Sequence, residues 1–256
     1  MVKRSNWSIP YLVFMVVFVV LPLVLIALYA VQDGSGHFTL ANITRFFTDS
    51  DALSTFALSL EVAIENTVIC ILLGYPAAWI LSNREYNKGA VAVILFLMPM
   101  WINALMRTLA TAELFNVFGI TLGKGTLLMG MVYDFIPFMI YPIYNTLMKM
   151  DKSYAEAAED LGATPWRVFW KVTVPLSMPG VMSGVLMVFM PTVSTFAISE
   201  FLTNNKIKLF GTIIQENINS SMWNYGAALA FVMLLIIGIT TLFQGKDDNA
   251  AEGGLI

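Results

Sequence analysis

The sequence has 256 residues, of which 58% are hydrophobic and only 12% are charged, and its mean hydropathy is +0.74. Charged residues make up about a quarter of an ordinary soluble domain, so this composition excludes a water-soluble protein and indicates an integral membrane protein. The net charge of −3 argues against nucleic-acid binding, and the single cysteine excludes an intrachain disulfide and a cysteine-based zinc site.

Six apolar segments are each close to the length of about 20 residues that a helix needs to cross a bilayer. The first is too long for the core of a signal peptide, so we expect it to remain in the chain. The expected spans are Ile9–Val31, Leu58–Leu81, Ala90–Glu113, Thr126–Leu147, Gly180–Leu202 and Tyr225–Phe243. We therefore predict an all-α, polytopic membrane protein with six transmembrane helices.

These spans are predicted to form a single transmembrane domain over residues 1–256. Its core covers residues 58–245, and a polar loop covers residues 149–178. The acidic, glycine-containing end at 245–256 is expected to be a flexible tail.

The distribution of lysine and arginine predicts the orientation of the chain. With the amino terminus in the cytoplasm, nine of these residues lie inside: Lys3, Arg4, Arg84, Lys88, Lys149, Lys152, Arg167, Lys171 and Lys246. The outside then has Arg45, Lys124, Lys206 and Lys208, with Arg107 near the third span. Because loops rich in lysine and arginine stay in the cytoplasm, we expect both termini and the polar loop to be cytoplasmic.

Three carboxylates lie within or at the ends of the spans, where an unpaired charge costs at least about 2.5–3.5 kcal/mol and usually serves a pathway or a partner. Glu113 ends the third span, Asp134 lies inside the fourth and Glu200 lies near the outer end of the fifth. Aromatic residues of the same region are Trp101, Tyr133, Tyr141 and Tyr144. Carboxylates and aromatic faces together can bind the ammonium groups of a cation such as a polyamine. The candidate pathway residues are Asp134, Trp101, Glu113, Glu200 and Tyr141.

Other interpretations of these carboxylates stay open. Asp134 can pair with Arg107 as a structural salt bridge, and Glu113 and Glu200 can be hydrated helix ends. Glu61 and Glu65, one turn apart at the start of the second span, are expected at the membrane interface.

The sequence contains no recognisable catalytic constellation. Gly119–Gly125 is the nearest approach to a P-loop, but it has three residues between its glycines instead of four and lacks the Ser or Thr after the lysine. His37 is the only histidine and is interpreted as a surface residue. No cluster has the spacing of metal ligands. We therefore predict a non-catalytic chain that obtains its energy from another protein.

A polar segment, Asp151–Gly180, separates two apolar spans. Ser153 and Glu156 have the spacing of a capping box and predict the start of a helix. Gly162 can supply the left-handed residue that ends it. This helix has an apolar face of Tyr154, Ala157, Ala158 and Leu161 and an acidic face of Glu156, Glu159 and Asp160.

A second short helix is predicted after this glycine. Thr164 is its expected N-cap and Pro165 its first residue, and Pro175 and Pro179 are expected to end it. Its aromatic face consists of Trp166, Phe169 and Trp170, with Thr173. We interpret the two helices as a docking element for another protein. The alternative is a hairpin lying on the bilayer, where anionic lipid would repel the acidic face.

The residues Glu156–Ala158, followed after three residues by Gly162, resemble the EAA loop found in the membrane subunits of ABC importers. Four further segments resemble the permeases of spermidine/putrescine importers: Leu73–Trp79, Pro99–Arg107, Phe135–Pro142 and Trp223–Ala228. The similarity extends over about residues 9–245. It implies the fold of a type I ABC importer permease in the bacterial inner membrane. By this resemblance, Glu156, Ala157, Ala158 and Gly162 form a coupling segment that sits in a cleft of an ATPase.

The resemblance also implies partners. These are a PotC-like second permease, a PotA-like ATPase dimer that binds ATP and magnesium, and a PotD-like external protein that delivers the polyamine. The complex as a whole would hydrolyse ATP and move substrate by alternating access. Two alternatives stay open: a permease of the same type for an anion, a metal chelate or a sugar, and an ATP-independent secondary transporter, for which inverted repeats would be expected.

Overall fold

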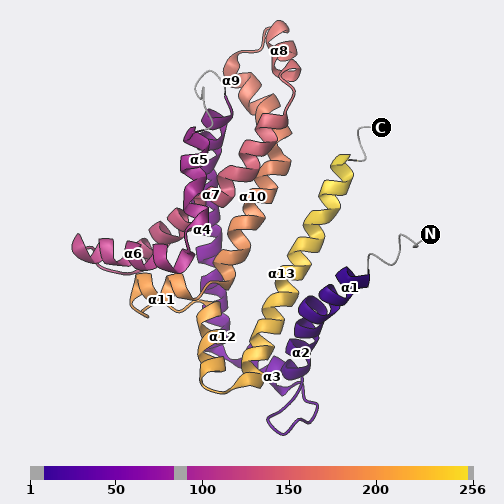
Figure 1. Cartoon of the computed structure of the whole chain (residues 1–256), viewed down its shortest axis with the longest axis vertical. Helices are drawn as coiled ribbons and strands as arrows, with labels where there is room; N and C mark the ends of the chain where they lie inside the picture. Colours follow the sequence, from indigo (N-terminus) through magenta and orange to yellow (C-terminus); the bar gives the residue numbers. More distant parts are fainter. Residues whose placement is uncertain (1–8, 84–90, 253–256) are drawn as a thin grey trace. The chain divides into compact units, whose positions relative to one another are not determined.

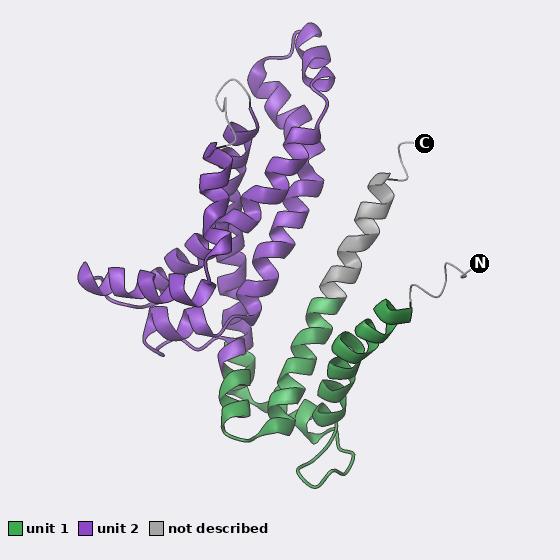
Figure 2. Cartoon of the chain, in the orientation of Figure 1, with its two compact units in different colours: residues 1–55, 213–256 green, residues 56–212 purple. Residues whose placement is uncertain are grey.

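The computed structural model of the chain describes residues 9–83 and 91–252, with side chains as far as Gly238 (Figure 1). Within these residues all regular structure is helical, apart from an isolated bridge between Gln32 and Phe38. The prediction of an all-α fold is thus confirmed. Contacts divide the chain into unit 1, residues 1–55 and 213–256, and unit 2, residues 56–212 (Figure 2).

Unit 1 combines the first and last helices of the chain. Its elements are α1 (Ile9–Met15), η2 (Val16–Val20), α2 (Leu21–Ala30), α3 (Ala41–Thr48) and α13 (Trp223–Glu252), with the start of α4 (Ser50–Ser82) and the end of α12 (Phe210–Asn219). The first three form one apolar helix of 22 residues, in which the π-helical turn η2 precedes Pro22. α13 packs against α2 and α3.

Polar side chains hold the first turn of α13 within unit 1. Asn224 Nδ2 donates a hydrogen bond to the main-chain oxygen of Gln32 at 2.9 Å, and the Tyr225 hydroxyl donates to Asp49 Oδ2 at 3.0 Å. Asp49 Oδ1 accepts a hydrogen bond from the main-chain N–H of Ala52 at 3.3 Å, so Asp49 caps the start of α4. The Ala52 N–H and then the Tyr225 hydroxyl lower the pKa of Asp49 below its usual value of 3.8.

Unit 2 contains the remaining helices. They are α5 (Val91–Leu97), η3 (Met98–Trp101), α6 (Ala104–Val117), α7 (Lys124–Lys149), α8 (Ser153–Asp160), α9 (Pro165–Val168), η4 (Phe169–Thr173), α10 (Val174–Ser194) and α11 (Ala197–Thr203), with most of α4 and the start of α12. α7 and α10 pack against each other and share a buried core with α4, formed by Cys70, Tyr75, Ala78, Met139, Ile140, Ile143, Val181 and Val188. Within unit 2, α8 and α9 lie at one end, and α6 and α11 lie toward the other (Figure 1).

The packing in unit 2 relies on small residues and buried hydrogen bonds. A Cβ atom on Gly180 of α10 would lie 2.9 Å from the main-chain oxygen of Pro142 of α7, so glycine at this position lets the two helices approach closely. Between α4 and α10, Asn66 Nδ2 donates to Thr192 Oγ1 at 2.9 Å, and both side chains are fully buried. Both features are typical of helix contacts in membranes.

Four of the described helices are long and apolar enough to cross a bilayer: Ile9–Ala30, Ser50–Ser82, Lys124–Lys149 and Pro165–Ser194. Val91–Trp101 and Ala104–Val117 form a fifth candidate only as a pair bent by 95°. α13 contributes the shorter apolar stretch Trp223–Gly238. The membrane helices are confirmed, whereas the count of six spans stays a prediction.

The third span was expected to be one helix, Ala90–Glu113, and this prediction is wrong. Pro99 lies in the 3-10 turn η3, and Ile102 after it has an extended backbone. The Asn103 side chain then accepts a hydrogen bond from the N–H of Leu105 at 2.9 Å and caps a new helix, α6. The proline and this cap together explain the break.

The boundaries predicted for the fifth span are also wrong. Pro175 and Pro179 do not end the preceding helix, because a single helical path runs from Pro165 to Ser194. The π-helical turn η4 ends two residues before Pro175 and widens the helix next to the proline, which lacks an N–H. At the other end the helix stops at Ser194, and Leu202 belongs to α11.

Some predicted features fall on residues that the structure does not describe. The set of cytoplasmic lysines and arginines includes Lys3, Arg4, Arg84 and Lys88, which lie outside the described residues, as does the side chain of Lys246. α13 stays helical as far as Glu252, within the segment expected to be a flexible tail.

Candidate coupling and substrate sites

The polar segment begins with a helix cap that differs from the predicted one. Asp151 Oδ1 accepts a hydrogen bond from the main-chain N–H of Ser153 at 2.9 Å, which lowers the pKa of Asp151 below 3.8. Ser153 is consequently the first residue of α8, and the predicted capping box with Glu156 does not form. The prediction of a helix starting here is confirmed, but the carboxylate two residues earlier takes the role assigned to the hydroxyl.

The end of α8 follows the prediction. Gly162 has φ of +82°, its N–H donates to the Glu159 oxygen at 2.8 Å, and the N–H of Ala163 donates to the Ala158 oxygen at 3.0 Å. These two bonds define a Schellman motif, which usually has glycine at its left-handed position. The motif fixes the corner between α8 and α9.

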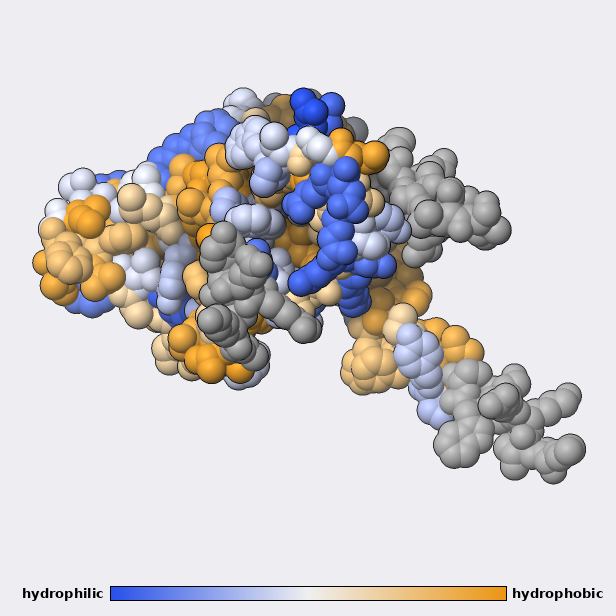
Figure 3. Space-filling model, turned by 90° about the horizontal axis from the view of Figure 1, so that it is seen from above, coloured by the Kyte–Doolittle hydropathy of each residue, from blue (hydrophilic) through white to orange (hydrophobic). Residues whose placement is uncertain are grey.

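The surface of α8 is open to a partner. Glu156, Ala157 and Gly162 are exposed, and Ala158 is half-buried. Two apolar side chains beside them, Tyr154 and Leu161, are 56% and 90% exposed. Figure 3 looks onto this end of unit 2 and shows hydrophilic residues gathered there.

An aromatic cluster connects the polar segment to α4. The Phe169 ring contacts Tyr75 and Trp79 of α4 edge to face, with ring centroids 5.9 and 5.6 Å apart. On its other side it meets Trp166 and Trp170, which are 71% and 52% exposed. The sequence indicated the aromatic face of this helix but gave no sign that Phe169 would pack against α4. α8 follows α7 after a short loop and is joined by the Gly162 corner to the continuous helix Pro165–Ser194, whose Phe169 contacts α4.

Asp134 lies in the middle of unit 2 and is paired. Arg107 Nε of α6 lies 3.3 Å from Asp134 Oδ1, and the two side chains are 5% and 2% exposed. Thr108 Oγ1 donates a hydrogen bond to Asp134 Oδ2 at 3.0 Å. The structural alternative for Asp134, a salt bridge with Arg107, is thus realised.

The other candidate pathway residues lie on η3, α6, α7 and α11, and none of them is fully buried. Trp101 is 82% exposed in η3, Glu113 is exposed on α6, and Tyr141 is 44% exposed on α7. Glu200 is half-buried on α11. Among the described residues, no hydrogen bond or ion pair connects these side chains to Asp134. That the five residues together form one substrate pathway stays a prediction.

A second charged cluster was not foreseen from the sequence. Lys124 Nζ, at the start of α7, lies 2.6 Å from Glu61 Oε1 and 2.9 Å from Glu65 Oε1 of α4. Glu61 and Glu65 are one helical turn apart, so a single lysine can bind both, but Lys124 is at least 59 residues away in the sequence and no local pattern connects it to them. The described residues contain no group of three side chains that could hold a metal ion.

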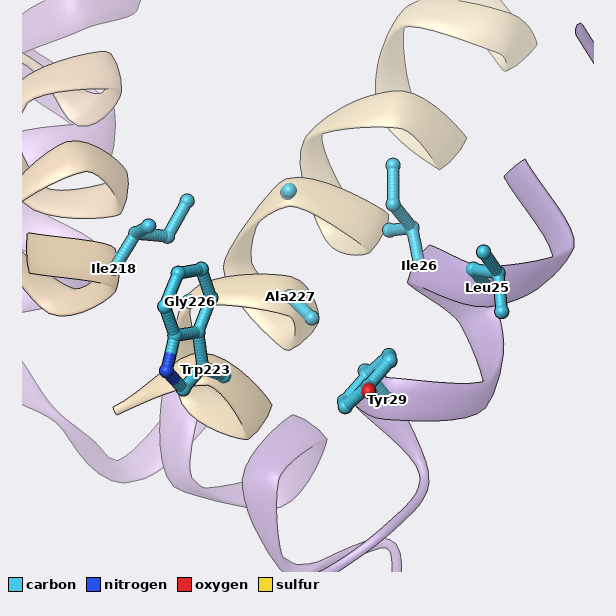
Figure 4. A pocket seen from close by; sticks show the side chains of 8 residues that line it. Leu25, Ile26, Tyr29, Ile218, Trp223, Gly226 and Ala227 are labelled. Atoms are coloured by element: carbon cyan, nitrogen blue, oxygen red, sulfur yellow. The ribbon is translucent and has the colours of Figure 1, made fainter. Parts of the chain in front are cut away.

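Cavities occur in both units. In unit 1, a cavity of about 570 Å³ lies among α2, α12 and α13, with Tyr29, Leu25 and Ile26 of α2 on one side and Trp223 of α13 and Ile218 of α12 on the other (Figure 4). In unit 2, a cavity of about 580 Å³ adjoins Arg107. Neither cavity contains a carboxylate.

Residues 6–246 match the family described as binding-protein-dependent transport system inner membrane component. The chain belongs to this family. This inner membrane component is 31% identical over 230 residues to the spermidine/putrescine transport system permease protein PotB of Escherichia coli K12, an alignment covering 83% of each chain. It is 32% identical to PotB of Haemophilus influenzae, covering 89% of this chain and 86% of that one. A PotB homolog of Mycoplasma pneumoniae is 27% identical, covering 98% and 84%.

Two solved structures share the fold of this inner membrane component. One is a bacterial ABC transporter involved in the import of the acidic polysaccharide alginate, with a TM-score of 0.68, 18% identity and coverage of 97% and 98% of the two chains. The other is an alginate ABC transporter in complex with a pentasaccharide-bound periplasmic protein, with a TM-score of 0.65 and 11% identity, covering 93% and 91%. The predicted ABC importer permease fold is confirmed, and family membership makes the chain a multi-pass membrane transport subunit.

Proposed function

We propose that this chain is the permease subunit of an ATP-driven importer of polyamines such as spermidine or putrescine. The observation that carries the proposal is the 31% identity to PotB over 83% of both chains. An external binding protein delivers the substrate, and the permease passes it across the membrane by alternating access. The EAA-like residues in an exposed cap at one end of unit 2 support a subunit driven by a separate ATPase.

The proposed complex contains a PotC-like second permease, a PotA-like ATPase dimer and a PotD-like binding protein. ATP and magnesium are bound by the ATPase subunits. The fold shared with a transporter that was solved with its periplasmic protein supports the part of this proposal that concerns an external receptor. Both termini and α8 lie in the cytoplasm of this assembly, as the distribution of lysine and arginine suggests.

The coupling site is formed by Glu156, Ala157, Ala158 and Gly162. Their exposure on a short helix fixed at both ends favours a rigid body that a partner can move. Closure of the ATPase dimer displaces α8, and the displacement reaches α10 through the continuous helix and α4 through Phe169.

The substrate pathway includes Asp134, with Glu113, Glu200, Trp101 and Tyr141 nearer to its entrance. A carboxylate buried inside a span supports a role in passing a cation. Because Arg107 neutralises Asp134 in the structure described here, the pair must change when substrate passes.

The test is ATP-dependent uptake by the full complex in proteoliposomes. The binding protein and radiolabelled spermidine are placed on the side of the membrane opposite to the ATPase subunits, and ATP is placed on the same side as the ATPase subunits. We expect uptake that requires ATP, the binding protein and this chain. A panel with an anion, a metal chelate and a sugar separates the closest alternative: uptake of one of these in place of polyamine would overturn the proposed substrate. Uptake that continues without ATP would instead indicate a secondary transporter.

A further inference from the structure

The Arg107–Asp134 pair is buried but poorly satisfied. The 3.3 Å contact between Arg107 Nε and Asp134 Oδ1 is an ion pair without hydrogen-bond alignment, because Nε, Nη1 and Oδ1 are all buried and make no hydrogen bond. The guanidinium makes one long hydrogen bond, from Nη2 to the main-chain oxygen of Asp134 at 3.4 Å. Buried polar atoms normally have hydrogen-bond partners, so this arrangement leaves room for better partners.

The guanidinium of Arg107 has an alternative position beside the Tyr133 ring. A cavity of about 580 Å³ that is open to the surface of this chain adjoins the guanidinium, and its lining, apart from Arg107 and Thr111, is Ile102, Met106, Ala110, Leu114 and Tyr133. Arg107 Cζ already lies 5.8 Å from the centre of the Tyr133 ring, at the outer limit of about 6 Å for a cation–π contact. A small rotation of the side chain into the cavity would improve this contact while releasing Asp134.

We propose that Arg107 is an internal substitute for the cationic substrate. In the empty pathway Arg107 neutralises Asp134, and when an ammonium group of the substrate pairs with Asp134, Arg107 moves into the cavity against Tyr133. This inference rests on the proposed function. The exchange never leaves the buried carboxylate unpaired, a state that is strongly destabilising. It also selects for cations, because an anion or a neutral solute cannot replace the guanidinium at Asp134.

The competition between Arg107 and the substrate for Asp134 should have a measurable effect on substrate affinity. If the pair is closed about 90% of the time, the apparent affinity for the cation is reduced about tenfold, since only the open fraction binds. Removing the guanidinium should recover this factor. The hydrogen bond from Thr108 to Asp134 Oδ2 does not involve the Arg107 side chain. It can therefore hold the carboxylate in place both when Arg107 is paired with Asp134 and when the substrate is.

The test measures equilibrium binding of radiolabelled spermidine to the purified complex of permeases and ATPase without binding protein. Arg107→Gln should bind spermidine about tenfold more tightly than the natural protein, and Arg107→Lys, which keeps the competing charge, should stay within about threefold. In proteoliposomes Arg107→Gln should also turn over more slowly, because nothing displaces the bound cation. A purely structural role predicts unchanged affinity per folded complex in both variants, and that result would overturn the inference.

A second pair of variants leaves the salt bridge intact. Tyr133→Leu removes the ring that receives the displaced guanidinium and should weaken spermidine binding several-fold, whereas Tyr133→Phe keeps an aromatic face and should not. Equal binding by both overturns the inference even if Arg107→Gln does not fold. Absence of any polyamine uptake by the natural complex would contradict the proposed function instead, so the two failures are distinguishable.

Discussion

The left-handed corner at Gly162 offers a quantitative test of how α8 works. Its φ of +82° is favourable only for glycine, and a Cβ added there would meet no atom within 4 Å. The cost of Gly162→Ala therefore comes from the backbone alone, about 1–2 kcal/mol for an L-residue in this conformation. The lower entropy of the unfolded chain with alanine returns about 0.4–1 kcal/mol. The net loss is about 1 kcal/mol, or roughly fivefold in the population of the ordered corner.

The effect should follow backbone preference and not side-chain size. Asparagine tolerates the left-handed conformation better than alanine, so Gly162→Asn should be milder than Gly162→Ala, and Gly162→Val should be the most severe. Gly125→Ala is the matched control, because a Cβ there also meets nothing within 4 Å and its φ is not in the left-handed region. Hydrogen exchange of α8 and substrate-stimulated ATP hydrolysis by the full complex are the assays. Equal exchange and equal stimulation in Gly162→Ala and the natural protein would refute a role for a rigid corner.

Four further outcomes are expected. Glu156→Lys should abolish uptake and ATPase coupling while the chain stays inserted, as measured by uptake and membrane immunoblotting; normal uptake would contradict the docking assignment. Phe169→Ala should uncouple ATP hydrolysis from transport because it removes the ring contacts with α4, which are worth about 0.5–1.5 kcal/mol each; an unchanged ratio of substrate moved to ATP hydrolysed argues against this route. Asp134→Asn should lower polyamine uptake more than protein level, and unchanged uptake would leave Asp134 a structural role alone. Asp49→Ala should lower thermal stability by about 1 kcal/mol through loss of a helix cap. Since the pKa of Asp49 in the folded protein is lowered, its contribution to stability should be fully present above pH 3.8 and be lost as the pH falls from there through the lowered pKa. A difference in stability between Asp49→Ala and the natural protein that persists in stronger acid would contradict this cap.

Helices that depend on one local pattern were predictable from the sequence. The long apolar runs at Ile9–Ala30 and Lys124–Lys149 are helical as expected, because hydrocarbon requires every backbone group to be satisfied within the segment. The corner at Gly162 was also predictable from a local pattern, because few residues other than glycine adopt the left-handed conformation that ends α8. The prolines at 175 and 179 were misjudged, because a proline can either break a helix or be accommodated by a wider turn beside it. Only the surrounding structure decides between these outcomes.

The site was predictable in part. Asp134 and Arg107 are opposite charges in neighbouring spans, so their pairing could be stated as an alternative. The bridge of Lys124 to Glu61 and Glu65, and the contact of Phe169 with α4, join residues at least 59 positions apart in the sequence. Such contacts are fixed by the packing of whole helices and leave no local pattern. The prediction of a capping box was wrong for a simpler reason. Asp151 and Ser153 can each cap the start of α8, and the Asp151 carboxylate accepts the hydrogen bond from the Ser153 N–H.

The most direct test of this account is the accessibility of α8 in native membranes. A cysteine placed by Ala157→Cys would be treated with a membrane-impermeant maleimide in inside-out and right-side-out vesicles, with and without the ATPase subunits, and Lys206→Cys would serve as the control for the opposite face. We predict that the cysteine at 157 reacts only in inside-out vesicles and that the bound ATPase protects it. Labelling of that cysteine in right-side-out vesicles, or labelling that the ATPase does not reduce, would contradict a cytoplasmic segment through which a separate ATPase drives transport.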